Sequence, residues 1–297
     1  MTINVITGKC ILRYLLRLTI LKLTQTQPLN YRLDIQGLRG IAILAVVLFH
    51  LNPNWLSGGF VGVDVFFVIS GFLITQILIK AKNDDAPIRS FYLRRIIRLF
   101  PAYFLMLIGS ALAVYFIFFP KQTIDFTQSL VTAVLYVSNI YFSSTINYLT
   151  VDIHLLPLLH TWSLSVEFQC YLIYPFLLYF LIRQQKISTS IALLILLSCL
   201  LPLTIWLTNY NADIAFFSPT VRLYQFLAAS AFFINNKAMV FLGEISYSLY
   251  LWHWPVIVFY KTLFSPNLAF NDYILLISLS LSLAILSWFF IERKLKL

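Results

Sequence analysis

An arginine and a histidine, Arg39 and His50, stand eleven residues apart in one apolar stretch of the sequence. On an α-helix this spacing is about three full turns, so both side chains share one face and lie roughly 16 Å apart along the axis. An ionisable group at that depth in a bilayer is costly and is by default a functional candidate. A histidine can take a proton from an attacking hydroxyl near neutral pH. The pair therefore suggests a general base, although a lone histidine is more simply a structural residue bonded to a neighbouring helix.

Asp64 is the only charged residue in the apolar segment 60–79, and it follows the pair Gly58-Gly59. Two interpretations compete. The carboxylate could orient His50 or a donor hydroxyl, or it could cap a helix that starts after a Gly-Gly turn. We expect capping to be its primary role.

Three arginines, Arg94, Arg95 and Arg98, lie in the loop after that segment. Arg95 and Arg98 are three residues apart and become neighbours on a helical turn. Two adjacent guanidinium groups fit phosphate oxygens better than lysines would. On charge alone, however, an anchor that touches lipid phosphates on the inner face of a membrane is the favoured interpretation.

Two further stretches combine polar and aromatic residues. His160 and Glu167 are seven residues apart and fit one helical face, and an acid in the first turn of a helix also favours the helix dipole. Ser246, Tyr250 and His253 lie along one face of another segment, whose tryptophans also fit an aromatic belt at the membrane interface. The sequence contains no phosphate-binding loop, and its three cysteines show neither a disulfide framework nor metal spacing.

The amino-acid composition indicates which kind of secondary structure carries these residues. Of the 297 residues, 60% are hydrophobic and 11% are charged, whereas a soluble domain has about 25% charged residues. This excludes a soluble enzyme, a disordered chain and a nucleic-acid binder. Continuous apolar runs favour α-helices over barrel strands, so we expect an all-α polytopic membrane bundle. Its segments are predicted at 37–51, 60–79, 99–119, 127–142, 165–182, 190–208, 220–234, 240–260 and 273–291.

Residues 1–30 differ from the rest, because basic residues interrupt their apolar pattern. They are predicted to form a basic amphipathic extension on the cytoplasmic face or a poorly ordered one, and residues 31–297 a membrane domain. With the N-terminus inside, about twice as many Lys and Arg residues lie inside as outside. That bias supports this orientation most clearly for the first four segments.

Five stretches, in this order, resemble the acyltransferase 3 family, the integral-membrane acyltransferases that modify bacterial surface glycans. The likeness runs from about Tyr31 to Glu292. The stretches are 31–50, which ends in His50; 59–73, which contains Gly62-Val63-Asp64-Val65-Phe66-Phe67; the pair Arg95 and Arg98; 160–167, His160-Thr161-Trp162-Ser163-Leu164-Ser165-Val166-Glu167; and 245–255, which contains Leu251-Trp252-His253-Trp254-Pro255.

The resemblance implies transfer of an acyl group, usually acetyl, from cytoplasmic acyl-CoA to a hydroxyl of a surface glycan or lipid-linked sugar. His50 is then the catalytic base or a transient acyl carrier. Arg39 holds the donor or the charge on its carbonyl, and Arg95 and Arg98 bind the CoA phosphates. The supporting or substrate-binding residues are Asp34, Asp64, His160, Trp162, Ser163, Glu167, Ser246, Tyr250 and His253.

The resemblance also implies a multi-pass protein of the bacterial cytoplasmic membrane, in contact with lipids. Acyl-CoA is its co-substrate, and no bound cofactor, metal or nucleic acid is expected. The acceptors considered include lipopolysaccharide and other surface polysaccharides.

Four features depart from the family pattern. Gln36 replaces an Asp, Phe168 replaces a second Glu, and the stretch after Arg222 lacks a Trp-Glu pair and a Gly. Two helices that the family carries are missing between Ala231 and Asn235. A catalytically inactive, truncated member is therefore an alternative. A glycolipid carrier or flippase is a second one, for which inverted repeats with broken helices are expected but not seen.

Overall fold

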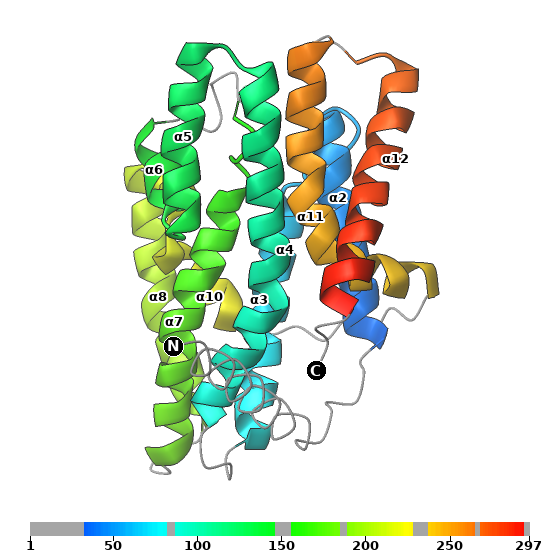
Figure 1. Ribbon diagram of the computed structural model, residues 1–297. Helices are drawn as coiled ribbons and strands as arrows, with labels where there is room; N and C mark the ends of the chain where they lie inside the picture. Colours follow the sequence, from blue (N-terminus) through cyan, green and yellow to red (C-terminus); the bar gives the residue numbers. More distant parts are fainter. Residues whose placement is uncertain are drawn as a thin grey trace, which may run out of the picture.

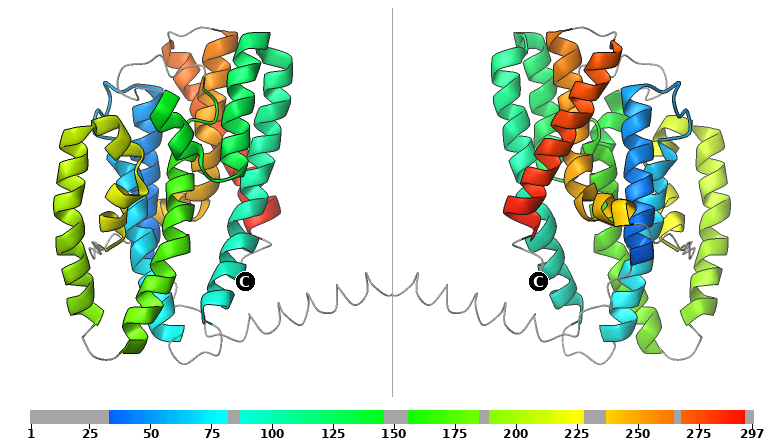
Figure 2. Two further views of the ribbon diagram at one scale, coloured as in Figure 1. Left: turned by 90° about the vertical axis from the view of Figure 1, so that its left-hand side faces the viewer. Right: turned by 90° about the vertical axis from the view of Figure 1, so that its right-hand side faces the viewer.

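A computed structural model describes residues 33–81, 87–145, 156–184, 189–227, 237–264 and 268–293. These residues form a bundle of helices without a strand, shown in Figures 1 and 2, which confirms the all-α expectation. The predicted extension 1–30 lies outside them. The helices are α2 (Leu33–Leu51), α3 (Val61–Lys80), α4 (Pro87–Ile117), α5 (Pro120–Val134), α6 (Ser138–Thr145), α7 (Thr161–Gln184), α8 (Thr189–Tyr210), α9 (Ala212–Phe217), α10 (Pro219–Leu227), α11 (Lys237–Leu263) and α12 (Phe270–Ser287), which continues into the π-helix η3 (Trp288–Glu292).

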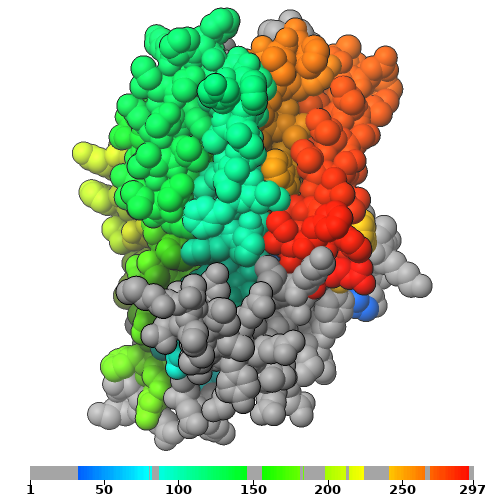
Figure 3. All heavy atoms as spheres, viewed as in Figure 1, coloured from blue at the N-terminus to red at the C-terminus, as the bar shows by residue number. Residues whose placement is uncertain are grey.

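Four described helices are long and apolar enough to cross a membrane, namely Leu33–Leu51, Val61–Ile79, Pro87–Ile117 and Phe270–Glu292. Nine crossings are not confirmed. Large apolar side chains are exposed along α4, α5, α12 and η3, which form much of the face in Figure 3; they include Tyr115, Phe116, Ile124, Leu275 and Phe290. Such a face suits contact with lipid chains, since water would disfavour it.

The predicted crossing at 127–142 is wrong as a single helix. The chain leaves α5 after Val134 and enters α6 at Ser138, and between them Tyr136 has a φ of 55°. Its ring packs 4.7 Å from that of Tyr103 and 4.5 Å from that of Phe168, measured between ring centroids. The aromatic contacts hold a backbone conformation that ends the helix. With 15 and 8 residues, α5 and α6 are both shorter than the ~20 residues that a crossing needs.

Side-chain amides satisfy the backbone around this break. The Gln169 amide on α7 donates to the carbonyl oxygen of Tyr136 (3.0 Å) and to the Asn139 side chain (2.9 Å). Asn139 in turn donates to the carbonyl oxygen of Phe217 at the end of α9 (3.2 Å). Irregular backbone is tolerated within a membrane bundle where protein groups satisfy it. The same bonds fix α9, whose last residues reach the site described below.

Three glycines allow the helices around α2 to approach closely. A Cβ atom on Gly59 or Gly62 would stand 2.3 Å or 2.4 Å from the carbonyl oxygens of Ala45 and Ala42 on α2. A Cβ on Gly243 of α11 would stand only 1.9 Å from the carbonyl oxygen of Gln36. Small residues permit such backbone contacts between membrane helices. As a result α3 and α11 both lie against α2, as Figure 2 shows (blue, cyan and orange).

Candidate active site

His50, in the last turn of α2, lies against a second histidine from α11. Its Nδ1 atom is 3.0 Å from Nε2 of His253, and the two rings stack with centroids 5.1 Å apart. The His253 ring is fully buried, whereas His50 is half-buried. On its other edge, Nδ1 of His253 lies 2.8 Å from the carbonyl oxygen of Tyr250. The same two helices also cross closely at Gly243, which lies near the start of α11.

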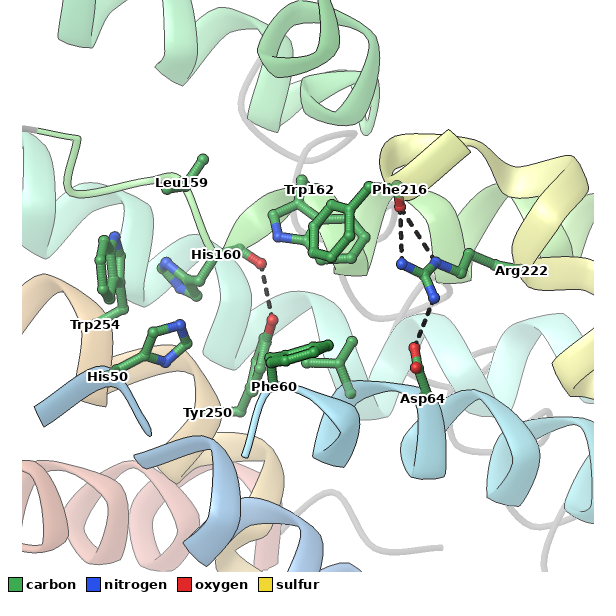
Figure 4. Close-up of a pocket in the computed structure, with 11 residues that line it drawn as sticks. His50, Phe60, Asp64, Leu159, His160, Trp162, Phe216, Arg222, Tyr250 and Trp254 are labelled. Atoms are coloured by element: carbon green, nitrogen blue, oxygen red, sulfur yellow. Dashed lines mark hydrogen bonds and ion pairs between the residues drawn. The ribbon is translucent and has the colours of Figure 1, made fainter. Parts of the chain in front are cut away.

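A cavity beside this pair, here called the histidine cavity, is shown in Figure 4. Its described lining residues are His50, Phe60, Val63, Asp64, Leu159, His160, Trp162, Phe216, Arg222, Tyr250 and Trp254. The Trp254 ring stands 4.7 Å from that of His50, and its indole N–H donates to the carbonyl oxygen of Leu156 (2.8 Å). This bond ties the chain before α7 to α11. The cavity is therefore mainly aromatic, with two histidine rings and one ion pair in its wall.

His160 faces His50 across this cavity (Figure 4) and is 3% exposed. Neither of its ring nitrogens makes a hydrogen bond of normal geometry within the described part of the chain. The carbonyl groups of Pro157 and Leu251 lie near the ring, and that of Leu251 lacks its helical donor because residue 255 is proline. Burial, and to a smaller degree the neighbouring His253, lowers the pKa of His160 well below its usual value. The ring is therefore neutral at pH 7.

Asp64 forms an ion pair with Arg222 of α10, at 2.7 Å between Oδ1 and Nη1. Arg222 also donates from Nε and Nη2 to the carbonyl oxygen of Phe216, at 3.2 Å and 3.1 Å (Figure 4). The expected capping role of Asp64 is wrong, since the N-cap residue of α3 is Phe60 and no side chain caps that helix. Asp64 lies in the first turn, where a carboxylate favours the helix dipole. The pair leaves the wall of the histidine cavity with little net charge.

A second cavity, here called the arginine cavity, is lined in part by Arg39, Arg95 and Arg98. Its other described lining residues are Val63, Phe66, Phe67, Ile69, Ser70, Leu73, Leu99, Ser163, Leu164, Glu167, Tyr171, Ser246, Tyr247 and Tyr250. Glu167 is the one carboxylate among them, and it accepts hydrogen bonds from the hydroxyls of Ser70 and Tyr171. The three arginines and one carboxylate give this lining an excess of positive charge, which Glu292 reduces through its electrostatic interaction with Arg39 and Arg98.

The guanidinium groups come from two helices. Arg39 lies three turns before His50 on α2, and Arg95 and Arg98 lie on α4. Arg95 stacks on the ring of Tyr171, with 4.8 Å between the guanidinium carbon and the ring centroid. The two cavities share Val63 and Tyr250 in their linings. The two cavities are therefore neighbours, with these two residues between them.

Tyr250 stands at this junction. Its hydroxyl donates to the carbonyl oxygen of His160 (3.0 Å) and shares a bond of 2.5 Å with the hydroxyl of Ser163. Its ring packs 6.4 Å from that of Phe66. These contacts fix α11 against the start of α7 where the cavities meet.

Most residues predicted from sequence meet at these cavities. Asp64, His160, Trp162 and Tyr250 line the histidine cavity with His50, and Ser163, Glu167, Ser246 and again Tyr250 line the arginine cavity with the three arginines. His253 lies behind His50. Asp34 is buried at the start of α2 and lines neither cavity.

Sequence reasoning missed Arg222, Ser70 and Tyr171. Arg222 carried a signal, because it is the only charged residue in the apolar segment 220–234. The two hydroxyl residues carried none, since serine and tyrosine are common in apolar helices.

The departures from the family pattern have structural counterparts. Phe168 packs on the rings of Tyr136 and Phe100, at 4.5 Å and 6.1 Å, and is not among the residues that line the arginine cavity. Gln36 accepts a long hydrogen bond of 3.5 Å from Arg39. The junction between Ala231 and Asn235 lies outside the described residues.

Comparison with known proteins gives one family. A family model described as "Acyltransferase domain" matches residues 32–234. O-acetyltransferase OatA of Staphylococcus aureus (strain NCTC 8325 / PS 47) is 29% identical over 348 residues, which cover 90% of this chain and 57% of that protein. A putative O-acetyltransferase of S. aureus (strain MSSA476) is 29% identical over 353 residues, covering 91% and 58%. No solved structure matches.

The chain thus spans little more than half the length of these curated relatives. The alignment with OatA, 348 residues, is longer than the whole chain of 297, so segments within the aligned part of that relative have no counterpart here. The match to the family model ends at residue 234, beside the point where two helices are expected to be missing.

Proposed function

The chain belongs to the acyltransferase family whose model matches residues 32–234, and we propose that it is a membrane O-acyltransferase. The donor in this proposal is acyl-CoA, with acetyl-CoA first, and the acceptor is a hydroxyl of a surface carbohydrate or lipid-linked sugar. The names of both relatives, O-acetyltransferases, support the reaction class. The observation that carries the proposal is that a cavity with three arginines adjoins a cavity that contains His50.

The arginine cavity suits the donor. The phosphates of CoA carry several negative charges, and guanidinium groups bind such oxygens in pairs. Arg95 and Arg98 would hold these phosphates, and Arg39, which lines the same cavity, would help to hold the donor. The flexible arm of CoA would then lead past Tyr250, over the roughly 16 Å that separate Arg39 from His50 on one helix.

The reaction would take place at His50. Nε2 of His50 accepts the proton of the acceptor hydroxyl while the hydroxyl oxygen attacks the thioester carbonyl. The carbon–sulfur bond breaks, and the proton on His50 passes to the departing thiolate, which leaves as free CoA. An acyl group carried briefly on Nε2 gives the same products in two steps. Both routes require a neutral imidazole with a lone pair on that nitrogen.

In this proposal the acceptor enters the histidine cavity, which has room for little more than a water molecule and must widen to admit a sugar. Trp162, Trp254 and Phe216 provide flat apolar surfaces, while the Asp64–Arg222 pair and His160 provide polar groups. A sugar ring presents both apolar C–H faces and hydroxyls, and this wall complements both. In this proposal the protein lies in the bacterial cytoplasmic membrane with the start of α2 towards the cytoplasm, where acyl-CoA is found.

The test is acyl transfer by membranes that contain the protein. Acetyl-CoA labelled in the acetyl group is supplied with extracted surface glycan, and label in the glycan is compared between wild type, His50→Ala and His154→Ala. His154 is the control because nothing in the sequence gives it a role. We expect transfer by wild type and the control, and a loss of at least 10²-fold in His50→Ala. Equal transfer in all three would refute His50 as the base, and no transfer by an abundant, inserted wild type with any glycan would favour an inactive truncated member.

A further inference from the structure

The pair of histidines between α2 and α11 has a defined hydrogen-bond direction. The Nδ1 atom of His253 lies 2.8 Å from the carbonyl oxygen of Tyr250 and 3.2 Å from that of Leu249. A carbonyl oxygen only accepts hydrogen bonds, so the hydrogen of the His253 ring must be on Nδ1. Its Nε2 atom is then a lone-pair acceptor.

The same reasoning fixes the tautomer of His50. Its Nδ1 lies 3.0 Å from Nε2 of His253, and because the latter accepts, Nδ1 of His50 must donate. The remaining nitrogen of His50, Nε2, then has no hydrogen. From this geometry we infer that His253 is a positioning residue, which holds His50 with its hydrogen on Nδ1 and its lone pair on Nε2. The value of that lone pair for acyl transfer rests on the proposed function above.

A neutral partner suits the place where the pair lies. The His253 ring is fully buried, and a charged partner in its place would have to be taken out of water within the bundle. When His50 accepts a proton on Nε2, its Nδ1–H bond to His253 is retained, so the ring does not have to turn during the reaction. A partner that orients and supports the base in this way serves the role that a buried carboxylate serves in hydrolytic triads.

The surroundings keep His253 in place. Its neighbour Trp254 is bonded to the carbonyl oxygen of Leu156, and Tyr250, one turn earlier, is bonded to His160 and Ser163. The crossing at Gly243 leaves α11 no space to move closer to α2. The orientation of the His50 ring is therefore set by the packing of α11.

The first experiment reads the tautomer directly. The chain contains four histidines, so ¹⁵N-histidine labelling of the protein in bilayers gives few enough NMR signals to assign by removing one histidine at a time. We expect both His50 and His253 to have a protonated Nδ1 and an unprotonated Nε2 at pH 7 to 8. A hydrogen on Nε2 of His50 in the wild type would overturn the inference. This measurement needs no substrate, so its result stands whether or not the proposed function is correct.

The second experiment uses two variants of matched size. His253→Gln retains an amide oxygen that can accept from Nδ1 of His50, and His253→Phe retains a ring without an acceptor. We expect kcat to fall about 10²-fold in His253→Phe with the KM for acetyl-CoA unchanged, and to stay within about 10-fold of wild type in His253→Gln. In His253→Phe the signals of His50 should also show hydrogen on Nε2. An inserted, stable His253→Phe protein with wild-type kcat, or equal losses in both variants, would contradict a positioning role.

Discussion

Replacing Gly243 by alanine tests whether the crossing of α2 and α11 supports the site. The added Cβ would stand 1.9 Å from the carbonyl oxygen of Gln36 and 2.6 Å from its carbonyl carbon. Real Cβ atoms essentially never approach closer than 3.0 Å, so the two backbones must separate by about 1 Å. Both neighbouring atoms belong to backbone, and no side chain can turn aside to relieve the contact.

Two effects of opposite sign determine the result. Alanine favours the helix over glycine by about 1 kcal/mol. Overpacking costs about 1–3 kcal/mol, and contact with rigid backbone places this substitution at the upper end. We therefore expect a net loss of about 2 kcal/mol, which corresponds to a fall of about 4–8 °C in the unfolding temperature. The catalytic loss should be larger, because a displacement of about 1 Å at a reacting group can lower a rate 10²-fold.

The assay is thermal unfolding of the purified protein in detergent, with acyl transfer measured in parallel. Gly58→Ala is one matched control, since its Cβ would meet nothing within 4 Å. Gly109→Ala on α4 is the other, since its Cβ would meet only the tip of the Trp252 ring, at 3.0 Å. Both controls should unfold at or slightly above the wild-type temperature. A Gly243→Ala protein that unfolds with the controls and transfers at their rate would refute the close crossing.

Three further predictions concern other parts of the site. Arg222→Met should lower the free energy of unfolding by about 3 kcal/mol, because it removes the ion pair with Asp64. Adding Asp64→Asn should restore part of the loss, and a loss that grows in the double variant would contradict the pairing. Arg98→Gln should raise the KM for acyl-CoA about 10- to 100-fold with a smaller change in kcat, as measured by steady-state kinetics, since a phosphate contact stabilises ground state and transition state alike. Phe168→Glu should lower the unfolding temperature without raising the transfer rate, because the new carboxylate would lie against the ring of Tyr136 rather than in a cavity. A variant with faster acyl transfer would show instead that this chain lacks activity for want of the second Glu of the family pattern.

The sequence predicted the helices well where apolar runs were continuous. The segments 60–79, 165–182 and 190–208 fall within or nearly within α3, α7 and α8, because a long apolar run can satisfy its backbone in lipid only as a helix. It failed at 127–142, where the run of hydrophobic residues continues across the break at Tyr136. Hydrophobicity indicates that a segment can lie in lipid or in the protein interior, and it does not indicate the aromatic packing that bends the chain there.

The sequence identified most residues of the candidate site, but it could not show how these residues are arranged in space. Arg39 and His50 could be placed on one face because helix geometry relates residues on a single helix. The approach of His253 to His50 spans 203 positions in sequence, and that of Arg222 to Asp64 spans 158. Periodicity within one segment says nothing about such distances.

By itself the sequence determined the class of the molecule, most of its long helices and the family to which it belongs. Composition and short motifs are local properties, and both can be read without knowing which helices touch. Only the tertiary structure decided that Asp64 pairs with Arg222 rather than capping α3, that Phe168 faces an aromatic cluster, and that His253 lies within hydrogen-bond distance of His50. These contacts depend on how closely α3, α10 and α11 can approach their neighbours, and that distance is set by packing between segments remote in sequence.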